Sequence, residues 1–425
     1  MKVFKFGGAS VKDVDSVKNV ATIINKFPNE NLIIVISAMG KMTNALEELV
    51  KSIYNNKSDK FEIFNNIKSY HNNIIEGLFS ENKKEINNEI NKFYNEIEEI
   101  IKLDNHKNFD KLYSQIVAFG ELLGTKIVSL YLNDIKIKNN WIDIRSLIKT
   151  EKLYTDARVK WQETVELLNK NFNGLTTNEI ILTQGFIASD SNGDTTTLGR
   201  EGSDFTGAIL AYSLNAESLT IWKDVPGVLN ADPKWFDETQ ILSNISYKEA
   251  VELAYFGATV IHPKTIKPLQ NKNIPLLVKS FVNPNNPGTI INNNTSEDSI
   301  IPSFIFKMNQ ILISISTIDY SFIMEDNLSE IFGLFAKHGI KINLMQNSAI
   351  SFSAAFDYNK FKLESLLNDL KNSYTALINE NLELVTIRHF DEKTINRVKQ
   401  GKDVLIIQQS RSTIRMIMKD LGLFN

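Results

Sequence analysis

Residues 1–10 read M-K-V-F-K-F-G-G-A-S, and this stretch decides the fold class. Val3, Phe4 and Phe6 form a short apolar run with strong β character, and two glycines end it abruptly. Behind them, apolar residues recur at helical spacing over residues 14–24. The chain therefore opens as strand, glycine turn and helix, which predicts an α/β fold.

This opening suits a bound phosphate group. Gly7 and Gly8 let backbone amides approach an anion, and the N-terminus of the helix that follows favours negative charge. Lys5 stands at the end of the strand, where its ammonium would face such an anion. The stretch contains neither a Walker loop nor a G-x-G-x-x-G fingerprint. An ordinary turn with a surface lysine is the alternative, so the function depends on what later segments add.

The composition describes an ordinary globular protein. A chain of 425 residues can bury two or three cores, so we expect several domains. The net charge of −3 and the lack of a long basic block argue against a nucleic-acid partner. The absence of cysteine excludes disulfides, thiolate metal sites and cysteine nucleophiles. No signal-peptide pattern and no apolar run near the roughly 20 residues of a membrane span are present, so we expect a cytoplasmic protein without a membrane partner.

Hydroxyl groups follow a second predicted strand. Residues 32–37 form a continuous apolar run, which is typical of a parallel strand covered on both faces. The run ends at Ser37, and Thr43 precedes another helical pattern. The carboxyl ends of strands in open α/β sheets are where ligands bind. Residues 51–112 then indicate helices packed on one side of the domain, without recognisable chemistry.

One acid lies within an apolar helical pattern over residues 113–132. Glu121 has valine, alanine, phenylalanine and leucine neighbours and two glycines nearby. An acid on a helix is usually solvated, and a side chain that faces a binding site is the alternative.

The second informative stretch covers residues 190–204. A turn over 190–194 and a short edge strand lead to Gly199-Arg200-x-Gly202-Ser203-Asp204, which opens a helix of small residues. A glycine loop at a helix N-terminus, with one guanidinium and one carboxylate, suits an anionic substrate near a metal-bound phosphate. A simple turn and helix cap is the alternative.

Two turns with acidic residues follow the strand predicted over residues 218–222. They lie at 223–228 and 230–234 and are compatible with nucleotide or magnesium contacts, or with plain surface turns. Residues 256–264 indicate the end of a helix and the start of a strand, in which His262 has a structural role because no second histidine lies near it.

The remainder of the chain predicts a second domain. Residues 283–300 are rich in asparagine and proline and indicate a linker. A β-α-β-β-α-β order follows, typical of the ferredoxin-like split βαβ fold. Its elements are predicted at 304–317, 328–338, 340–346, 349–356, 361–370 and 382–388. Further strands at 404–408 and 412–418 leave too little chain for a second complete unit.

At this point the motifs point to a family. Lys5-Phe6-Gly7-Gly8-Ala9-Ser10-Val11, the 199–204 loop and Trp222-Lys223-Asp224-Val225-Pro226-Gly227-Val228 closely resemble those of the aspartate kinases in order and spacing, and the tail resembles their ACT regulatory domains. The resemblance implies an α/β fold: an amino-acid-kinase three-layer αβα sandwich over residues 1–285, a linker over 286–303 and a ferredoxin-like ACT region over 304–425. One complete ACT unit is expected at about 310–380, and a truncated one is expected after it.

The resemblance also implies the reaction. An aspartate kinase transfers the γ-phosphoryl group of ATP to the β-carboxylate of L-aspartate, giving 4-phospho-L-aspartate on the way to lysine, threonine, methionine and diaminopimelate. ATP and Mg²⁺ are the implied cofactors. The attacking carboxylate is already ionised near neutral pH, so positioning and positive charge would suffice without a general base.

Roles for individual residues follow from the resemblance. Lys5 would neutralise charge on the transferring phosphoryl group, and Asp204 would orient Lys5. Arg200 would hold the substrate α-carboxylate and Glu121 its ammonium. The other implied substrate contacts are Ser37, Thr43 and Ser203, and the implied ATP contacts are Lys5, Gly7, Gly8, Ser10, Lys223, Asp224, Gly227, Val228 and Asp232. No protein side chain is implied as a metal ligand.

Three positions depart from the family pattern. Ala9 stands where a threonine is common, Thr259 replaces the lysine of an F-G-A-K motif, and Leu229 replaces a frequent tyrosine. Each change concerns the nucleotide side of the site, so contacts with adenine and phosphate are expected to differ from those of the family.

The ACT resemblance implies regulation and assembly. Met345, Gln346, Asn347 and Ser348 occupy the strand–turn–strand where an effector would bind, with lysine or threonine as the candidates. Plain turn formation is the alternative for this segment. ACT domains pair across chains, so a homodimer or higher homo-oligomer is expected.

Two other functions remain open from sequence. One is another amino-acid kinase that acts on glutamate, acetylglutamate or a nucleoside monophosphate. The other is a catalytically weak amino-acid sensor, which only Thr259 and Leu229 favour. The intact set Lys5, Glu121, Arg200 and Asp204 favours an active, monofunctional aspartate kinase.

Overall fold

The first ten residues form the expected start of an α/β layer structure. The computed structural model describes residues 1–103, 106–172, 178–236, 238–258 and 261–421. β1 (Lys2–Phe6) ends at Gly7, a short 3₁₀ turn η1 (Gly8–Val11) follows, and α1 (Val14–Ile24) begins behind it. Asp13 caps α1, since its side chain accepts a hydrogen bond from the Ser16 amide at 2.8 Å.

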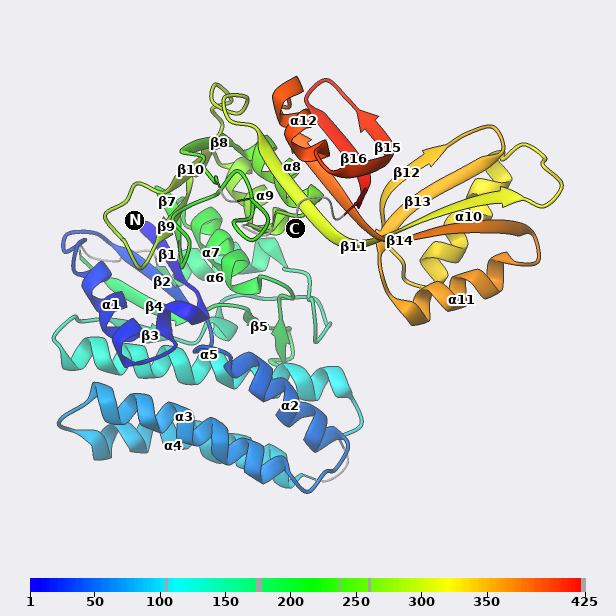
Figure 1. Ribbon diagram of the computed structural model, residues 1–425. Coiled ribbons are helices and arrows are strands. Elements are labelled where there is room, and N and C mark those ends of the chain that lie inside the picture. Colours follow the sequence, from blue (N-terminus) through cyan, green and yellow to red (C-terminus); the bar gives the residue numbers. More distant parts are fainter. Residues whose placement is uncertain (104–105, 173–177, 237, 259–260, 422–425) are drawn as a thin grey trace. The chain divides into compact units, whose positions relative to one another are not determined.

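The described chain divides into two units (Figure 1). The first comprises Met1–Leu229, Ile241–Ala254 and Thr259–Asp298. The second comprises Asn230–Gln240, Tyr255–Ala258 and Ser299–Asn425.

An eight-stranded sheet in the order β3-β4-β2-β1-β7-β9-β10-β8 forms the centre of the first unit. Neighbouring strands are parallel except β9 and β10. Besides β1, the strands are β2 (Leu32–Ile36), β3 (Asn140–Ile142), β4 (Ile180–Gln184), β7 (Ser218–Lys223), β8 (Asn244–Ser246), β9 (Leu276–Ser280) and β10 (Thr289–Asn292). A separate hairpin joins β5 (Ile187–Ser189) to β6 (Thr195–Thr197). The parallel order explains why β2 is buried along its whole length.

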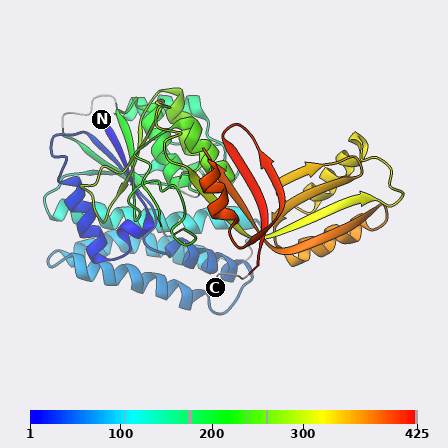
Figure 2. The same cartoon turned by 45° about the horizontal axis from the view of Figure 1, so that its top comes forward.

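Helices cover both faces of this sheet, so the first unit is the expected three-layer sandwich (Figure 2). The helices are α2 (Met42–Tyr54), α3 (Lys60–Leu78), α4 (Lys83–Lys102), α5 (Phe109–Asp134), α6 (Trp161–Phe172), α7 (Gly202–Ser213), α8 (Tyr247–Phe256) and α9 (Pro263–Asn271), with a short 3₁₀ turn η2 (Ile144–Ser146). Successive residues of a strand point to opposite faces. The Lys5 Cβ lies against Gly207 of α7, whereas Gln184, in register with Ile36 and Phe6, donates a hydrogen bond to Thr125 of α5 at 2.9 Å. The helices α5 and α7 therefore lie on opposite faces.

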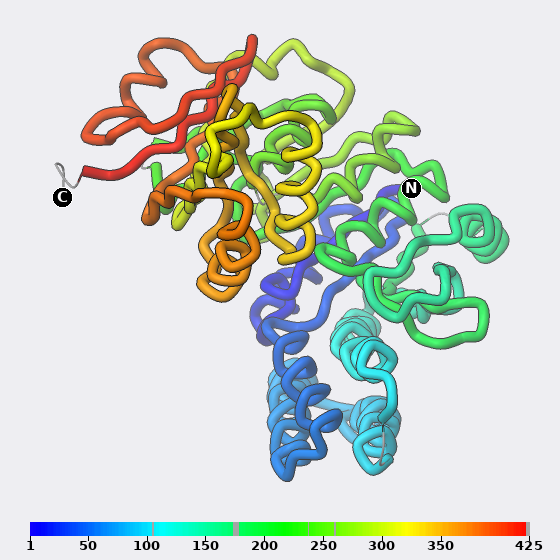
Figure 3. The backbone as a smooth tube through the Cα atoms, turned by 90° about the vertical axis from the view of Figure 1, so that its right-hand side faces the viewer, coloured from blue at the N-terminus to red at the C-terminus, as the bar shows by residue number. Residues whose placement is uncertain are grey.

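The segment predicted as helices over residues 51–112 forms α3, α4 and the flanks of its neighbours. α2 packs against α3 and α5, and α4 packs against α3 and α5, so these four helices lie side by side (Figure 3). α5 is the one helix in the described part of the chain long and apolar enough to cross a membrane by length and composition, which corrects the expectation of no such run. Of its apolar window 83% is buried inside the protein, as in the core helix of a globular domain.

A six-stranded sheet in the order β12-β13-β11-β14-β16-β15 forms the second unit. The strands are β11 (Ser303–Thr317), β12 (Ile342–Asn347), β13 (Ser351–Asp357), β14 (Tyr374–Arg388), β15 (Lys402–Gln409) and β16 (Thr413–Asp420). The helices are α10 (Glu325–Lys337), α11 (Lys360–Leu370) and α12 (Glu392–Lys399). The predicted β-α-β-β-α-β order is present from the second half of β11 to the first half of β14.

The last part of the chain differs from the expected truncated unit. Residues 303–307 of β11 pair with the second half of β14, which in turn pairs with β16. These strands, with α12 and β15, make a second set around its own apolar cluster, including Phe304, Val385 and Met416. The first strand of this second set, residues 303–307, precedes the complete unit in the sequence. The order of elements along the sequence therefore did not reveal the second set.

Two other sequence predictions are wrong in detail. β10 lies inside the predicted linker over 286–303, because Thr289 and Ile291 are buried against β9 and β8. Residues after His262 form the helix α9 rather than a strand. His262 caps that helix, since its Nδ1 accepts from the Lys264 amide at 3.1 Å, and this is the structural role predicted for it.

Candidate functional site

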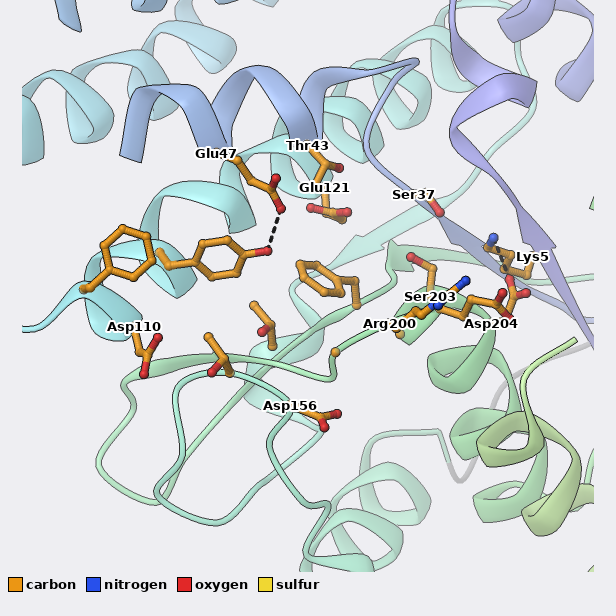
Figure 4. A pocket seen from close by; sticks show the side chains of 18 of the residues that line it. Lys5, Ser37, Thr43, Glu47, Asp110, Glu121, Asp156, Arg200, Ser203 and Asp204 are labelled. Carbon is orange, nitrogen blue, oxygen red and sulfur yellow. Dashed lines mark hydrogen bonds and ion pairs between the residues drawn. The ribbon is translucent and has the colours of Figure 1, made fainter. Parts of the chain in front are cut away.

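A cavity of about 620 Å³ lies at the carboxyl ends of β1, β2 and β7 (Figure 4). This is the edge where open α/β sheets bind ligands. The residues that line it are Lys5, Ser37, Thr43, Glu47, Phe109, Asp110, Tyr113, Glu121, Thr155, Asp156, Phe186, Thr197, Gly199, Arg200, Glu201, Gly202, Ser203, Asp204 and Lys223. Eight of the sequence-predicted residues therefore share one cavity: Lys5, Ser37, Thr43, Glu121, Arg200, Ser203, Asp204 and Lys223.

Two lysines and one carboxylate form the charged centre of the cavity. The Lys5 Nζ lies 2.6 Å from Oδ1 of Asp204, and the Lys223 Nζ lies 3.6 Å from Oδ2 of the same carboxylate. Burial raises the pKa of Asp204, but the attraction of Lys5 and then of Lys223 outweighs burial and holds this pKa below its ordinary value. The carboxylate is therefore ionised at neutral pH and is paired with both ammonium groups.

The glycine turn fixes the end of β1 next to this centre. A Cβ on Gly7 would lie 3.6 Å from the Lys5 Nζ, so this turn borders the ammonium. A Cβ on Gly8 would lie 2.7 Å from the carbonyl oxygen of Ala38 and 2.9 Å from that of Gly40. The Gly40 amide also donates to the Gly8 carbonyl at 3.0 Å. The turns after β1 and β2 are thus locked together, which only glycine at position 8 allows.

Glu121 brings a buried carboxyl group to the other side of the cavity. The residue is 2% exposed, and its Oε1 accepts a hydrogen bond from the Ala38 amide at 3.3 Å. Its Oε2 has no hydrogen-bond partner among the described residues. Burial raises the pKa of Glu121 to about 8, against smaller opposing effects of the Ala38 amide and Lys5. A buried carboxyl with an unused oxygen is suited to a cationic group of a ligand.

The loop over residues 199–204 supplies the guanidinium. Gly199 has φ +75°, and a Cβ there would lie 2.2 Å from Oδ1 of Asp156. Glu201 at the start of α7 also has a positive φ of 54°. A non-glycine residue in this left-handed region, such as Glu201, is uncommon, and such residues cluster at functional sites. The loop presents the exposed Arg200 side chain to the cavity. Asp156, which lines the same cavity, forms an ion pair with Lys264.

The cavity extends to residues that the sequence did not indicate. Tyr113 donates a hydrogen bond to Oε1 of Glu47 at 2.9 Å, and burial followed by this carboxylate raises the pKa of Tyr113 (Figure 4). Phe109 and Asp110 line the wall from the first turn of α5, before the predicted start of that helix. An acid and a tyrosine on two different helices carry no local sequence signal, since only the contact between α2 and α5 brings them together.

The remaining predicted ATP contacts lie outside this cavity wall. Gly7, Gly8 and Ser10 form the neighbouring turn, where the buried Ser10 hydroxyl has no partner among the described residues. Asp224, Gly227 and Val228 follow β7, and the Val228 amide donates to Oγ1 of Thr289 at 2.8 Å. Asp232 belongs to the second unit and accepts a hydrogen bond from the Lys234 amide at 2.9 Å, which is plain turn chemistry.

Two of the three departures from the family pattern can be described. Ala9 is exposed in η1, so a larger side chain would meet solvent there. Leu229 pairs with Ile241 in an isolated bridge. Thr259 lies outside the described residues.

The predicted effector segment lies at the end of β12. Met345, Gln346, Asn347 and Ser348 are exposed, and the Ser348 hydroxyl lies 2.7 Å from that of Ser351. This hydrogen bond closes the turn between β12 and β13. The segment is accessible to a ligand and is also a well-formed turn.

No metal cage is built from the described side chains. Within the described ranges, no three histidine, aspartate or glutamate side chains gather as a metal site would need. The carboxylate closest to the charged centre, Asp204, is paired with lysines.

Comparisons with known proteins give a consistent result. The model of the amino acid kinase family matches residues 1–280. Lysine-sensitive aspartokinase 3 of Escherichia coli is 30% identical over 393 residues, which cover 91% of this chain and 86% of that protein. The structure of E. coli aspartokinase III with aspartate and ADP (R-state) has a TM-score of 0.77 at 28% identity, covering 99% of this chain and 96% of that one. Its complex with lysine and aspartate (T-state) has a TM-score of 0.80 at 28% identity, with coverage of 98% and 95%.

Proposed function

The chain belongs to the aspartate kinases of the amino acid kinase family, and from this premise we propose how its own residues perform the reaction. An aspartate kinase transfers the γ-phosphoryl group of ATP to the β-carboxylate of L-aspartate. The observation that carries the proposal is the meeting of Lys5 and Asp204, at 2.6 Å, in one cavity with Glu121 and Arg200.

Two charged side chains and three hydroxyl groups hold the substrate. Arg200 binds the α-carboxylate of aspartate, because a guanidinium offers paired donors to a carboxylate. Glu121 binds the ammonium with its unused Oε2 and releases its proton as the cation arrives. Ser37, Thr43 and Ser203 donate hydrogen bonds to the carboxylates. With both α-groups held, the β-carboxylate points to Lys5.

Phosphoryl transfer then needs no enzyme nucleophile. An oxygen of the β-carboxylate attacks the γ-phosphorus, and the bond from that phosphorus to the β,γ-bridging oxygen breaks, so ADP leaves with its electron pair. Lys5 stabilises the negative charge on the transferring group, and Asp204 holds the Lys5 ammonium in place. Lys223 adds a second positive charge beside them. Electrostatic stabilisation of this kind is the main requirement of phosphoryl transfer.

The nucleotide is proposed to bind beside the glycine turn. Backbone amides of Gly7 and Gly8 and the partnerless hydroxyl of Ser10 are suited to phosphate oxygens. The loop after β7, with Asp224, Gly227 and Val228, borders the same strand end. Asp232 stays a prediction.

Magnesium is proposed to enter with the ATP phosphates. Mg²⁺ is usually held by substrate phosphates and by one or two carboxylates rather than by an all-protein cage. Asp204, the carboxylate at the charged centre, is paired with Lys5 and Lys223, so the phosphates would supply most of the ligands. When bound, the ion would neutralise charge on the phosphates.

The acceptor specificity gives the test of this function. Purified protein with MgATP is assayed for ADP release with L-aspartate, L-glutamate or no acceptor, with hydroxylamine present to trap an acyl phosphate. We expect ADP release and hydroxamate only with aspartate. Turnover with glutamate alone, or ADP without hydroxamate, would contradict the proposal.

We propose further that the second unit regulates the enzyme and pairs with that of another copy. The relative from E. coli is named as lysine-sensitive, and one of its structures contains lysine. The exposed Met345–Ser348 turn supports an effector site, and exposed apolar side chains at Tyr320, Phe322 and Phe361 support a homo-oligomer.

The effector site is tested by measuring the kinase rate at increasing concentrations of lysine and of threonine. A rate that responds to neither amino acid would contradict the effector site. Sedimentation of the full chain tests the homo-oligomer. The cytoplasmic location stays a prediction.

A further inference from the structure

A second cavity, of about 490 Å³, lies within the regulatory unit. Its walls include apolar side chains of α10 and β12, together with Gln408 and Arg415. Phe332, Phe335, Ala336, Ile340 and Leu344 give the apolar part. Of the four predicted effector residues only Met345 lines it, so the cavity adjoins the predicted effector segment but has different walls.

The cavity forms where the two edges of one sheet approach each other. We call this region the seam, and it is the place where Gln408 and Arg415 contact β12. β12 and β15 are the edge strands of the six-stranded sheet, and among the described strands β12 pairs with β13 alone. Even so, the Gln408 Nε2 donates to the Met345 carbonyl at 2.5 Å, and the Arg415 Nη2 donates to the Asn343 carbonyl at 2.6 Å. Carbonyls of alternate residues point outward from an edge strand. The sheet is therefore curved enough for two side chains to cap this edge.

Kinks in the two central strands explain the curvature. β11 and β14 each have 15 residues, and their register shifts between Lys307 and Leu312. Asn309 and Asn381, at this point on the two strands, both have positive φ, of 54° and 56°. Irregularities of this kind bend a sheet and increase its twist. The cavity is thus a consequence of the strand geometry and not of a loose loop.

Arg415 brings a guanidinium without a carboxylate partner to this seam, and one face of it lies over the Phe256 ring, 5.0 Å from the ring centroid. Its Nε also lies 3.4 Å from Oγ1 of Thr386, its neighbour in register on β14. Throughout the described part of the chain, no carboxylate lies within ion-pair distance of this guanidinium. Two of its five donors are therefore used on neutral oxygens, and the others remain available to a ligand.

The surroundings of the seam are also net positive. The Lys307 Nζ donates to Oδ1 of Asn343 at 2.9 Å, and the Asn343 Nδ2 donates to Oδ1 of Asp357 at 3.1 Å. Burial lowers the pKa of Lys307, Asp357 opposes this, and Lys341 and Arg415 lower it further. Three cationic side chains, Lys307, Lys341 and Arg415, therefore lie in this region with one carboxylate, Asp357. Asp357 already accepts hydrogen bonds from Asn343 and Gln310.

We propose that this cavity binds a small carboxylate with an apolar body, an α-amino acid or a 2-oxo acid with a branched or aromatic side chain. Arg415 receives the carboxylate, and the side chains of α10 and β12 receive the apolar part. No acidic side chain lines the cavity among the described residues, so an amino acid with a cationic side chain, such as lysine, is disfavoured there. The ligand differs from lysine and threonine, the candidates at the Met345–Ser348 turn, in that its side chain is apolar.

Direct binding to the full chain tests the inference, without reference to the kinase rate. Four probes are titrated calorimetrically: L-leucine, 4-methyl-2-oxopentanoate, 3-methylbutylamine and L-lysine. We expect at least one of the two apolar carboxylates to bind and the amine not to bind. Binding of leucine alone indicates an amino acid ligand, and binding of the oxo acid alone or of both indicates that the carboxylate dominates. Binding of the amine alone, or of neither carboxylate, overturns the proposal.

Matched variants locate the site. Arg415→Gln should raise the Kd of the bound carboxylate at least about tenfold, as expected for loss of a charge-assisted pair. Arg411→Gln removes an exposed arginine just before the same strand and should leave the Kd unchanged. Ala336→Phe, at an exposed helix position, fills the cavity and should abolish binding even if the Arg415 variant fails to fold. Equal Kd values in wild type and Ala336→Phe would overturn the assignment.

Discussion

The Lys5 ammonium and the Asp204 carboxylate lie 2.6 Å apart, and both are almost fully buried. One comes from the end of β1 and the other from the first turn of α7, so the contact joins the two glycine-bearing segments of the chain. A lysine side chain would otherwise be free to sample several rotamers. The contact with Asp204 fixes the position of the Lys5 ammonium, and a fixed positive charge is what the transfer of a phosphoryl group requires.

The first prediction concerns the pH dependence of substrate binding. The substrate ammonium needs an ionised Glu121, whose pKa is raised to about 8 by burial. Aspartate affinity should therefore fall by about tenfold per pH unit below pH 8 and level off above it. Calorimetry between about pH 6 and about pH 9 measures the aspartate affinity at each pH. The heat of transferring the released Glu121 proton to the buffer is a second readout. If the aspartate affinity of a Glu121→Gln variant fell with pH as steeply as that of wild type, Glu121 would not be the group that binds the substrate ammonium.

The same group should also affect stability without substrate. The folded pKa of Glu121 lies above its ordinary value of 4.5, so the folded state holds the proton more tightly than the unfolded state. Stability is then greatest below pH 4.5 and falls as the pH rises through about 8. Because a neutral amide avoids this loss, Glu121→Gln should melt above wild type at about pH 8 and much less so at about pH 5.

Thermal denaturation at the two pH values measures that difference, which should reach several degrees. Glu62→Gln on the exposed face of α3 serves as the control. The difference in melting temperature between this variant and wild type should be the same at the two pH values. A Glu121→Gln variant that is less stable than wild type at the higher pH would contradict this prediction. It would mean that the ionised carboxylate of Glu121 is stabilised by a partner in the folded protein.

Arg200 should control the affinity for aspartate. Arg200→Gln removes the guanidinium proposed to bind the α-carboxylate and should raise the KM for aspartate by about tenfold to a hundredfold. The KM for MgATP should change little. Steady-state kinetics measure both constants, with the exposed Arg158→Gln as a control of equal charge change. An unchanged KM for aspartate would assign that carboxylate to another residue.

Two glycines should respond in opposite ways to substitution by alanine. The Gly8→Ala Cβ would meet two backbone carbonyls at 2.7 and 2.9 Å, so the turns after β1 and β2 must separate. Both stability and activity should fall. Gly333 on α10 has open space around it, so Gly333→Ala should stabilise by up to about 1 kcal/mol. Melting curves and kinase rates of the two variants provide the comparison, and a fully active Gly8→Ala would show that the turn does not need its present form.

Much of the site follows from sequence because its residues lie at the ends of regular elements. Lys5, Ser37 and Lys223 stand at or just after strand ends, and Asp204 stands at a helix start, so parallel pairing alone brings them to one edge. The glycines beside them give a strong local signal. Glu121 could be singled out only because an acid is rare within so apolar a helix.

The parts that the sequence did not predict depend on distant packing. Glu47 and Tyr113 meet only because α2 packs against α5. The short strand β10 is hidden in an asparagine-rich segment and exists because β8 and β9 pair with it. Residues 303–307 complete a set of strands whose other members lie beyond residue 380, so no local pattern marks them.

The most direct test of the account is the rate of phosphoryl transfer in a Lys5→Ala variant. A single-turnover experiment with saturating MgATP and L-aspartate measures 4-phospho-L-aspartate as its hydroxamate, and Lys2→Ala on the same strand serves as the control. We expect a rate about a hundredfold to a thousandfold below wild type for Lys5→Ala and a nearly normal rate for the control. A Lys5→Ala rate within about twofold of wild type would contradict the central role of the Lys5–Asp204 pair.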